Sequence, residues 1–411
     1  MIMSINMSVN TNIEICKWYN NSSSPVMLFI DDLANVWVDL NGNGKVDLEE
    51  DWGYAKNEEN SSFTFLNKKL LKLFPYIKIT FFTPVGIRVG MIENSSIKSI
   101  SKMINCDEET KKFFKTIYDN PKFEIAYHGT THGKVGDKSD DFVQEWEIFK
   151  DLDEAVDTIN YGKEIYKDVF GKHPKGGKYC GYESNEYSDE SIDKTGFLWW
   201  CRYYNRGIVD NKNCSIGGKD TNSITNFDIK TFGENKVIDI PTTLDGEMFK
   251  DLLSLNPNIN TLKGLVKFIF RRYFIYREIK KIDYLLKNNL IISIQEHISP
   301  ARDDGRRQTP NIFDDLDSLI YIFNFLKGKN AWYCTCIELA SYVYNRENSR
   351  IVEDGGNKFH IEYKDRDGLE HKNISIKIEG ARYILPPSGG AITGNAGVFN
   401  IPIQNGYYEY C

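Results

Sequence analysis

Short apolar runs alternate with longer amphipathic stretches over most of the chain. Residues 26–30, 77–82 and 123–127 are rich in branched and aromatic side chains and are short enough to be strands buried on both faces. Residues 153–169 instead repeat apolar positions at helical spacing. This alternation is typical of βα units built around a parallel sheet or barrel. The pattern further predicts helices over residues 67–74, 188–194 and 314–326 and extended segments over 178–180, 290–294 and 331–336.

The pattern changes after about residue 346. Residues 359–363 and 374–378 alternate apolar and polar side chains, and Gly, Pro and Asn are frequent from 386 to 406. Alternation at period two, with turn residues between the runs, is typical of antiparallel strands that bury one face. The pattern therefore predicts an N-terminal extension over residues 1–25, a region of βα units over 26–345 and a small all-β domain over 346–411.

The net charge, the length of the apolar runs and the N-terminal residues each exclude a class of protein. The 411 residues include 51 Lys and Arg against 58 Asp and Glu, a formal net charge of −7. Nucleic acid is thereby excluded as the main partner, because phosphate binding needs a cationic surface. No apolar run approaches the roughly 18 residues that a membrane-spanning helix requires. Residues 1–24 lack the basic start and the continuous apolar core of a secretory signal, so we expect a cytoplasmic protein.

Polar side chains follow several of the predicted strands at the point where each strand ends. Asp31 and Asp32 follow residues 26–30, His128 follows 123–127, and His297 comes shortly after 290–294. The carboxyl ends of parallel strands meet at one edge of a sheet or barrel, where active sites are built. We therefore expect these side chains to lie close together.

Two imidazoles and a carboxylate are the usual ligands of a catalytic divalent metal that keeps one position open for water. His128 and His132 have the spacing that places both rings on one face of a helical turn. The alternative is that Asp31 and Asp32 cap a helix and that both histidines lie on the surface. The chain has six histidines in all, so two at this spacing directly after a strand favour the metal site.

The order of these segments resembles that of the polysaccharide deacetylase family, metal-dependent enzymes that remove N-acetyl groups from chitin oligomers and peptidoglycan. Phe29-Ile-Asp31-Asp32 is similar to the family's Thr-Phe-Asp-Asp strand end, and His128-Gly-Thr-Thr-His132 matches its His-Ser/Thr-x-x-His motif apart from Gly129. Three further segments resemble family motifs: Thr80-Phe-Phe-Thr-Pro-Val-Gly86, Ile294-Gln-Glu-His297 and Trp332-Tyr-Cys-Thr-Cys-Ile-Glu-Leu-Ala340.

This resemblance implies a deformed (β/α)7 barrel over residues 26–345, followed by the all-β appendage. It implies that Asp32, His128 and His132 hold a divalent metal, usually zinc. In the family's mechanism, Asp31 would be the general base and His297 the acid that protonates the departing amine. A metal lowers the pKa of its bound water to about 7 and polarises the carbonyl, so one carboxylate and one imidazole nearby suffice for amide hydrolysis. The implied function is removal of an N-acyl group from a sugar or a polysaccharide precursor.

The chain departs from the family at two motifs. The Arg-x-Pro-Tyr motif should fall near Lys178 and Tyr179, where lysine replaces the arginine and the proline is missing. Lysine supplies positive charge beside Asp31 without the bidentate fork of arginine. The candidates for the tryptophan of the fourth motif are Trp199 and Trp200, although core packing is the favoured role, and that motif's aspartate is not found. We name Lys178, Tyr179 and Trp200 as candidate contacts of substrate or oxyanion.

The altered motifs leave two other functions open. The barrel would act on a non-sugar amide if the changed motif forms a different pocket. Alternatively, the chain would bind carbohydrate without turnover while retaining the metal, with the β domain as a binding module.

A second metal motif lies between the first two strand ends. Residues 39–50, Asp-Leu-Asn-Gly-Asn-Gly-Lys-Val-Asp-Leu-Glu-Glu, fit the twelve-residue calcium loop, which needs oxygen ligands at alternate positions, a glycine at position 6 and a closing glutamate. No helix is predicted to enter it, so a lone dockerin-like loop is the better analogy. The alternative is a solvated Asn-Gly turn with acidic neighbours. The predicted calcium ligands are Asp39, Asn41, Asn43, Lys45, Asp47 and Glu50.

Overall fold

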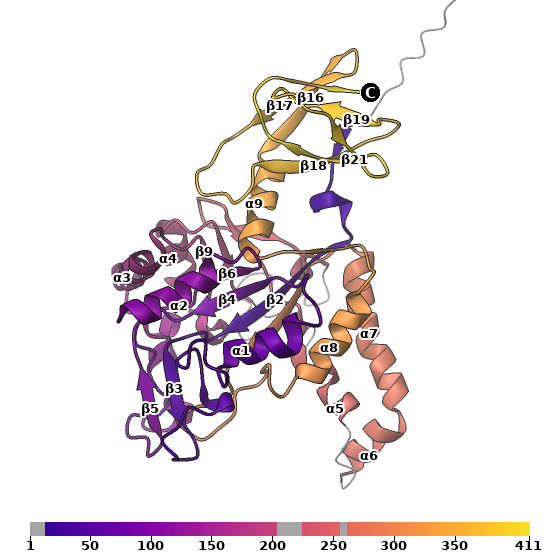
Figure 1. The fold of residues 1–411 in the computed structure, drawn as a ribbon. Coiled ribbons are helices and arrows are strands. Elements are labelled where there is room, and N and C mark those ends of the chain that lie inside the picture. The colour runs from indigo at the N-terminus through magenta and orange to yellow at the C-terminus, as the bar shows by residue number, and fades with distance from the viewer. Residues whose placement is uncertain (1–12, 204–223, 255–260) are drawn as a thin grey trace, which may run out of the picture. The chain divides into compact units, whose positions relative to one another are not determined.

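The computed structural model describes residues 13–203, 224–254 and 261–411 (Figure 1). Contacts divide the chain into two compact units. The larger unit is Ser24–Ile337, and the smaller one combines the segment up to Ser23 with Glu338–Cys411. Among the described residues, no helix is both long and apolar enough to cross a membrane.

The larger unit is a mixed α/β fold around one curled sheet of mainly parallel strands, consistent with a deformed barrel. Its strand order is β11-β12-β10-β9-β6-β4-β2-β14-β13, and β15 also pairs with β2. Every pairing along this path is parallel except that of β11 with β12. The strands are β2 (Ser24–Asp31), β4 (Ile79–Thr83), β6 (Phe123–Tyr127), β9 (Gly176–Lys178), β10 (Trp199–Cys201), β11 (Lys230–Phe232), β12 (Val237–Asp239), β13 (Leu244–Asp245), β14 (Ile292–His297) and β15 (Ala331–Tyr333).

The central strands are buried along their whole length, as expected for parallel strands covered on both faces. All eight residues of β2 and all five of β4 are buried. The predicted strands over 26–30, 77–82, 123–127 and 290–294 are therefore confirmed, with boundaries shifted by a few residues.

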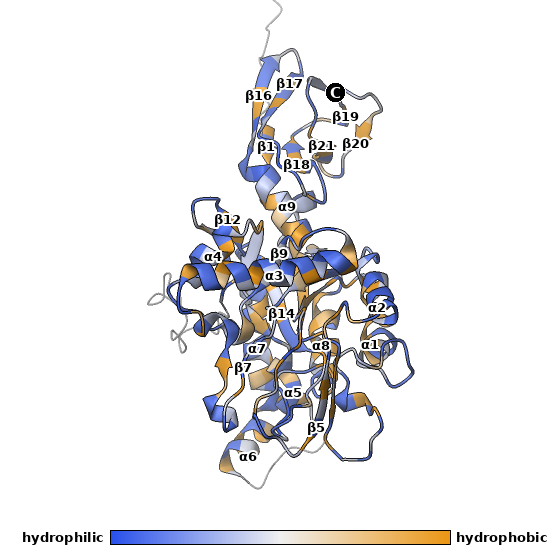
Figure 2. Ribbon diagram, turned by 90° about the vertical axis from the view of Figure 1, so that its left-hand side faces the viewer, coloured by the Kyte–Doolittle hydropathy of each residue, from blue (hydrophilic) through white to orange (hydrophobic). Residues whose placement is uncertain are grey.

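Helices cover the faces of this sheet. The helix predicted over 153–169 is α3 (Leu152–Phe170), which begins where the Asp151 side chain accepts the N–H of Glu154 and ends at Gly171 in a left-handed conformation. Figure 2 shows α3 crossing the sheet with hydrophilic residues along the side that faces the viewer. The other helices are α1 (Ser62–Leu66), α2 (Glu108–Tyr118), α4 (Ser188–Lys194), α5 (Lys250–Leu253), α6 (Leu262–Ile269), α7 (Arg271–Lys287) and α8 (Leu316–Leu326).

Two sequence-based elements differ from the structure. The helix predicted over 67–74 begins earlier, as α1, because Ser61 caps it by accepting the N–H of Thr64, and it continues as a π-helical turn over Asn67–Leu71. The extended segment predicted over 331–336 ends at Tyr333, and Cys336 begins α9 (Cys336–Glu347). At the start of α9, the backbone N–H of Cys336 donates to Thr80 Oγ1 and that of Ile337 donates to Glu124 Oε2. These N–H groups, which have no partner within the helix, are thus hydrogen-bonded inside the protein.

The smaller unit is built on antiparallel strands and confirms the strands predicted over 359–363 and 374–378. One sheet has the order β1-β18-β21 and the other β16-β17-β22-β19-β20. Alternate residues such as Ile374, Ile376 and Ile378 point into a shared apolar core with Phe359 and Tyr408. The strands are β1 (Ile13–Ile15), β16 (Ser349–Gly355), β17 (Lys358–Tyr363), β18 (Asn373–Ile378), β19 (Tyr383–Leu385), β20 (Ile392–Thr393), β21 (Val398–Pro402) and β22 (Tyr407–Tyr410).

Candidate functional site

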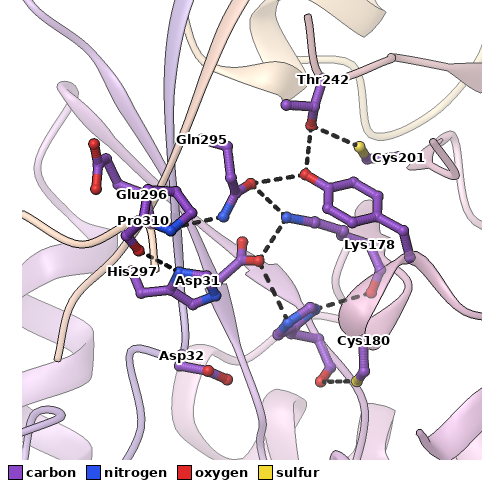
Figure 3. A network of polar contacts seen from close by, with 12 residues as sticks. Asp31, Asp32, Lys178, Cys180, Cys201, Thr242, Gln295, Glu296, His297 and Pro310 are labelled. Atoms are coloured by element: carbon purple, nitrogen blue, oxygen red, sulfur yellow. Dashed lines mark hydrogen bonds and ion pairs between the residues drawn. The ribbon is translucent and has the colours of Figure 1, made fainter. Parts of the chain in front are cut away.

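The register of β2 and β14 brings Asp31 and His297 together. Asp31 lies opposite His297 in this parallel pair. Because side chains alternate along a strand, Gln295 and His297 point to one face of the sheet and Glu296 to the other, as Figure 3 shows. His297 Nδ1 lies 2.6 Å from the carbonyl oxygen of Pro310, so this nitrogen carries the proton that it donates. The other ring nitrogen, Nε2, is therefore the one left for chemistry.

Lys178, at the end of β9, is completely buried beside Asp31. Its Nζ donates to Asp31 Oδ2 at 2.5 Å and to Gln295 Oε1 at 2.5 Å. Tyr182 Oη donates to the same Gln295 oxygen at 2.9 Å (Figure 3). The structure thus brings the Lys178 ammonium against the carboxylate of Asp31. The second oxygen of that carboxylate, Oδ1, is buried and accepts no hydrogen bond from the residues that the structure describes.

His128 and His132 lie in a loop, and the expectation of a helical turn is wrong. Both side chains are buried, and their ring centroids are 5.0 Å apart. His128 Nδ1 donates to the Lys178 carbonyl at 3.0 Å, which leaves its Nε2 3.8 Å from Asp31 Oδ2. Burial lowers the pKa of both imidazoles, that of His132 well below its usual value. Neutral imidazoles are the form that binds a metal.

Glu145 sets the shape of this loop. Its carboxylate accepts the backbone N–H groups of Thr130, Thr131 and His132 at 2.7–2.8 Å. In a helix these N–H groups would face carbonyls of the preceding turn, so the buried carboxylate takes the place of a helical hydrogen-bond ladder. Gly129 allows this close approach, because a Cβ there would lie 2.7 Å from Glu145 Oε2. Position 129 of this chain therefore requires glycine.

Replacing Gly129 with alanine should lower the free energy of unfolding by about 2–4 kcal/mol. Alanine would be strained at the left-handed φ of +87°, and its Cβ would displace the Glu145 carboxylate. Gly171→Ala is the matched control, since Gly171 has φ +77° but nothing within 4 Å of its Cβ position. That control should cost about 1 kcal/mol. Urea unfolding of both variants measures the difference, and equal losses would contradict the role given to Glu145.

Asp32 is held beside His132 in an unusual backbone conformation. Its φ is 64° and that of His132 is 72°, a left-handed region that few non-glycine residues occupy, although Asp and His do so more often than most. Asp32 Oδ1 lies 3.2 Å from His132 Nε2 and 3.7 Å from Arg88 Nε, and Gln308 Nε2 donates to Oδ2 at 2.7 Å. Burial by itself raises the pKa of Asp32, but its interactions with the His132 imidazole and the Arg88 guanidinium outweigh burial and hold this pKa below the usual range.

A buried cluster of His128, His132 and Cys180 could bind a metal ion. One ligand atom from each of the three residues lies within 4.8 Å of those of the other two. Asp32 contacts His132 but lies outside this mutual cluster. Cys180 donates its S–H to the His128 carbonyl at 3.2 Å, and burial raises the pKa of its thiol well above the usual value. Two imidazoles with either a carboxylate or a thiolate suit zinc.

Four residues beside the candidate ligands were not predicted from the sequence: Cys180, Glu145, Arg88 and Gln308. Of these four, Cys180 could have been predicted from its position, because it closely follows the end of β9, at the edge where the other strand ends gather.

Tyr179 and Trp200 are not brought to the site. Both are buried in the core, with ring centroids 5.4 Å apart. The Tyr179 hydroxyl donates to Asp189 Oδ1 at 2.8 Å. Their bulk is used for packing, which leaves Lys178 as the member of this candidate group that faces Asp31. The predicted calcium ligands Asp39, Asn41, Asn43, Lys45, Asp47 and Glu50 lie together in another part of the same unit, between β3 (Val36–Asp39) and the 3₁₀ turn η2 (Leu48–Glu50).

No family model matches the chain, and no curated protein matches its sequence. Among solved structures, it is similar to a protein described as a polysaccharide deacetylase from Mycobacterium smegmatis, with 15% identity and a TM-score of 0.43 over 79% of this chain and 92% of that one. An allantoinase is similar at 13% identity, with a TM-score of 0.44 over 80% and 92% of the two chains. A family 4 acetyl xylan esterase from Clostridium thermocellum, solved with a cobalt ion, has 10% identity and a TM-score of 0.31 over 75% and 87%. At these levels of similarity, function has to be inferred from the residues of the site itself.

Proposed function

We propose that this chain is a metal-dependent hydrolase that removes an N-acyl group, foremost acetyl, from a sugar or a polysaccharide precursor. One observation carries the proposal: two carboxylates and three imidazoles from three separate strand ends converge at one edge of a parallel sheet. Perturbed, buried titratable groups at such an edge are the usual mark of an active site. The residues are Asp31, Asp32, His128, His132 and His297.

The donor set fits a divalent metal of the zinc type. Asp32 is ionised and faces His132 Nε2 through an oxygen that has no hydrogen-bond partner, while both imidazoles are neutral. We assign the metal to Asp32, His128 and His132, with Cys180 as the competing third ligand. When bound, such a metal polarises the acyl carbonyl and lowers the pKa of water to about 7.

The remaining residues supply the proton transfers of amide hydrolysis. Asp31 Oδ1, which no protein donor occupies, accepts a proton from the attacking water, while Lys178 holds the other oxygen in place. His297 donates the proton of its Nε2 to the departing amine nitrogen as the C–N bond breaks. The carbonyl of Pro310 accepts a hydrogen bond from the opposite ring nitrogen, Nδ1, which fixes the orientation of the ring and leaves Nε2 for the transfer.

Acetate release from N-acetylglucosamine oligomers tests this function. Protein treated with a chelator and then reloaded with zinc or cobalt should release acetate, and the chelated protein should not. A panel of acyl amides without sugar is run beside it, because lysine in place of arginine at position 178 changes the charge geometry near the scissile bond. If only the non-sugar amides were hydrolysed, the substrate would be a non-sugar amide and not an N-acetylated sugar. Sugar binding with no turnover under any metal would overturn the hydrolase.

A further inference from the structure

The loop of residues 39–50 contains two buried carboxylates that no cationic side chain neutralises. Asp39 is 4% exposed and Glu50 is 3% exposed. Asp39 Oδ2 accepts the N–H of Gly44 at 3.0 Å, whereas its Oδ1 is buried without a hydrogen-bond partner. Among the residues that the structure describes, no Lys or Arg forms an ion pair with either carboxylate. Two buried carboxylates without an ion-pair partner, one of which has an oxygen that accepts no hydrogen bond, are costly, so their burial favours a bound cation.

The other oxygen-bearing side chains of the loop converge on the same turn. The side-chain amides of Asn41 and Asn43 donate to one oxygen of Asp47 at 2.6 and 2.8 Å. The backbone N–H of Asn41 is donated to Glu50 Oε1 at 3.2 Å, which draws the two ends of the loop together. Gly44, at position 6 of the loop, has the left-handed φ of +71° that the sharp turn of a calcium loop requires.

We propose that this loop binds one calcium ion and that the ion supports the position of Asp32. Its ligands are the carboxylates of Asp39, Asp47 and Glu50, the side-chain oxygens of Asn41 and Asn43, and the main-chain carbonyl of Lys45. An all-oxygen set with three carboxylates suits a hard cation that accepts six to eight ligands. The second half of the proposal rests on the proposed function, in which Asp32 is a ligand of the catalytic metal.

One connection to Asp32 runs through Trp52, two residues beyond the closing glutamate. The Trp52 backbone pairs with Ala34 and Val36, at 2.9 and 3.0 Å, just after the strand end that carries Asp32. The Arg88 guanidinium lies 4.3 Å from the centroid of the Trp52 ring, and Arg88 Nε is 3.7 Å from Asp32 Oδ1. Trp52, whose ring packs against Arg88, therefore directly follows the loop that calcium would close.

A second connection runs through Glu49, the residue before the closing glutamate. Glu49 Oε2 accepts from Arg307 at 2.6 Å, and its backbone carbonyl accepts from Ser299 at 3.3 Å. Gln308, next to Arg307, donates to Asp32 Oδ2 at 2.7 Å. One oxygen of Asp32 thus faces Arg88, which packs on Trp52, and the other accepts from Gln308, whose neighbour Arg307 is bound to Glu49.

Terbium luminescence tests the calcium site without any reference to activity. Trp37 Nε1 lies 3.5 Å from Glu50 Oε2, so excitation of Trp37 should sensitise a Tb³⁺ ion bound in the loop. We expect luminescence that calcium displaces, together with a Tm that rises on addition of calcium chloride. Glu50→Gln should weaken calcium binding at least by the 10–100-fold that loss of a supporting metal contact costs. Equal calcium affinity of the parent and Glu50→Gln, or no calcium binding by calorimetry at millimolar concentration, would overturn the site.

Glu49→Gln is the matched control, because it removes the same charge from the neighbouring residue, which is not a predicted ligand. It should bind calcium like the parent protein. The coupling to Asp32 is measured as zinc affinity with and without calcium. Calcium should tighten zinc binding in the parent, and this gain should shrink in Glu49→Gln and vanish in Glu50→Gln.

The possible failures are distinguishable. Calcium binding with an unchanged zinc affinity would overturn only the support of Asp32. Calcium binding without any zinc binding would overturn the proposed hydrolase and leave the calcium site in place.

Discussion

Replacing Asp31 with asparagine should lower kcat for acetate release by about 10²–10⁴-fold, the usual contribution of a general base. Asparagine still accepts a hydrogen bond from Lys178 but cannot take a proton from water. Since Asp31 is not an assigned metal ligand, zinc should remain bound at the parental stoichiometry. Kinetics on N-acetylglucosamine oligomers, with zinc content measured on the same samples, check both expectations.

Asp189→Asn is a matched control for this change. Asp189 also accepts from a buried cation, Arg202 at 2.6 Å, and from the Tyr179 hydroxyl, but it does not belong to the converging strand-end group. Its replacement should lower stability and leave kcat within a few-fold of the parental value. If Asp31→Asn kept more than about a tenth of the parental kcat, a general-base role would be excluded.

Asp32→Asn should lower zinc affinity far more than Cys180→Ser does. The low pKa of Asp32 keeps its carboxylate ready to bind, whereas the raised pKa of Cys180 keeps its sulfur protonated and hydrogen-bonded to the His128 carbonyl. We expect Asp32→Asn to weaken zinc binding by at least about 10–100-fold and to abolish turnover, and Cys180→Ser to change affinity only a few-fold. Competition with a chromophoric chelator measures both constants.

The absorption spectrum of the cobalt-loaded protein gives an independent view of the same question. A thiolate bound to cobalt produces a charge-transfer band in the near ultraviolet, and a carboxylate does not. A strong band in the parent that disappears in Cys180→Ser, with zinc affinity lost in that variant, would replace the assignment of Asp32 with the cluster of His128, His132 and Cys180.

Much of the sheet and its functional edge could be predicted from the sequence. Fully buried strands such as β2 and β4 appear as uninterrupted apolar runs, and the next polar residue then marks the strand end. Asp31 and His128 were placed by this logic. His297 was placed through the apolar run before it, although that strand extends further than predicted, from Ile292 to His297 itself.

The details that shape the site could not be predicted, because they depend on partners distant in sequence. Glu145 reaches the loop of His132 from a segment with no periodic pattern, and Gln308 reaches Asp32 from another. The helical expectation for His128 and His132 failed because it considered only local spacing. Trp200 and Tyr179 fill the core, a role that their residue types permit equally well.

The pairing of β1 with β18 has a consequence for how the polypeptide is made. Ile13 pairs with Ile378, so β1 has no partner in this sheet until synthesis of the chain has reached β18. β18 is the middle strand of that three-stranded sheet, so deletion of residues 13–15 would turn it into an edge strand with unpaired backbone groups that can pair with another chain. Truncated variants that begin after Ser23 should therefore also end near Ile337. Removal of β1 alone leaves the edge of β18 unpaired, and removal of β18 alone leaves β1 unpaired.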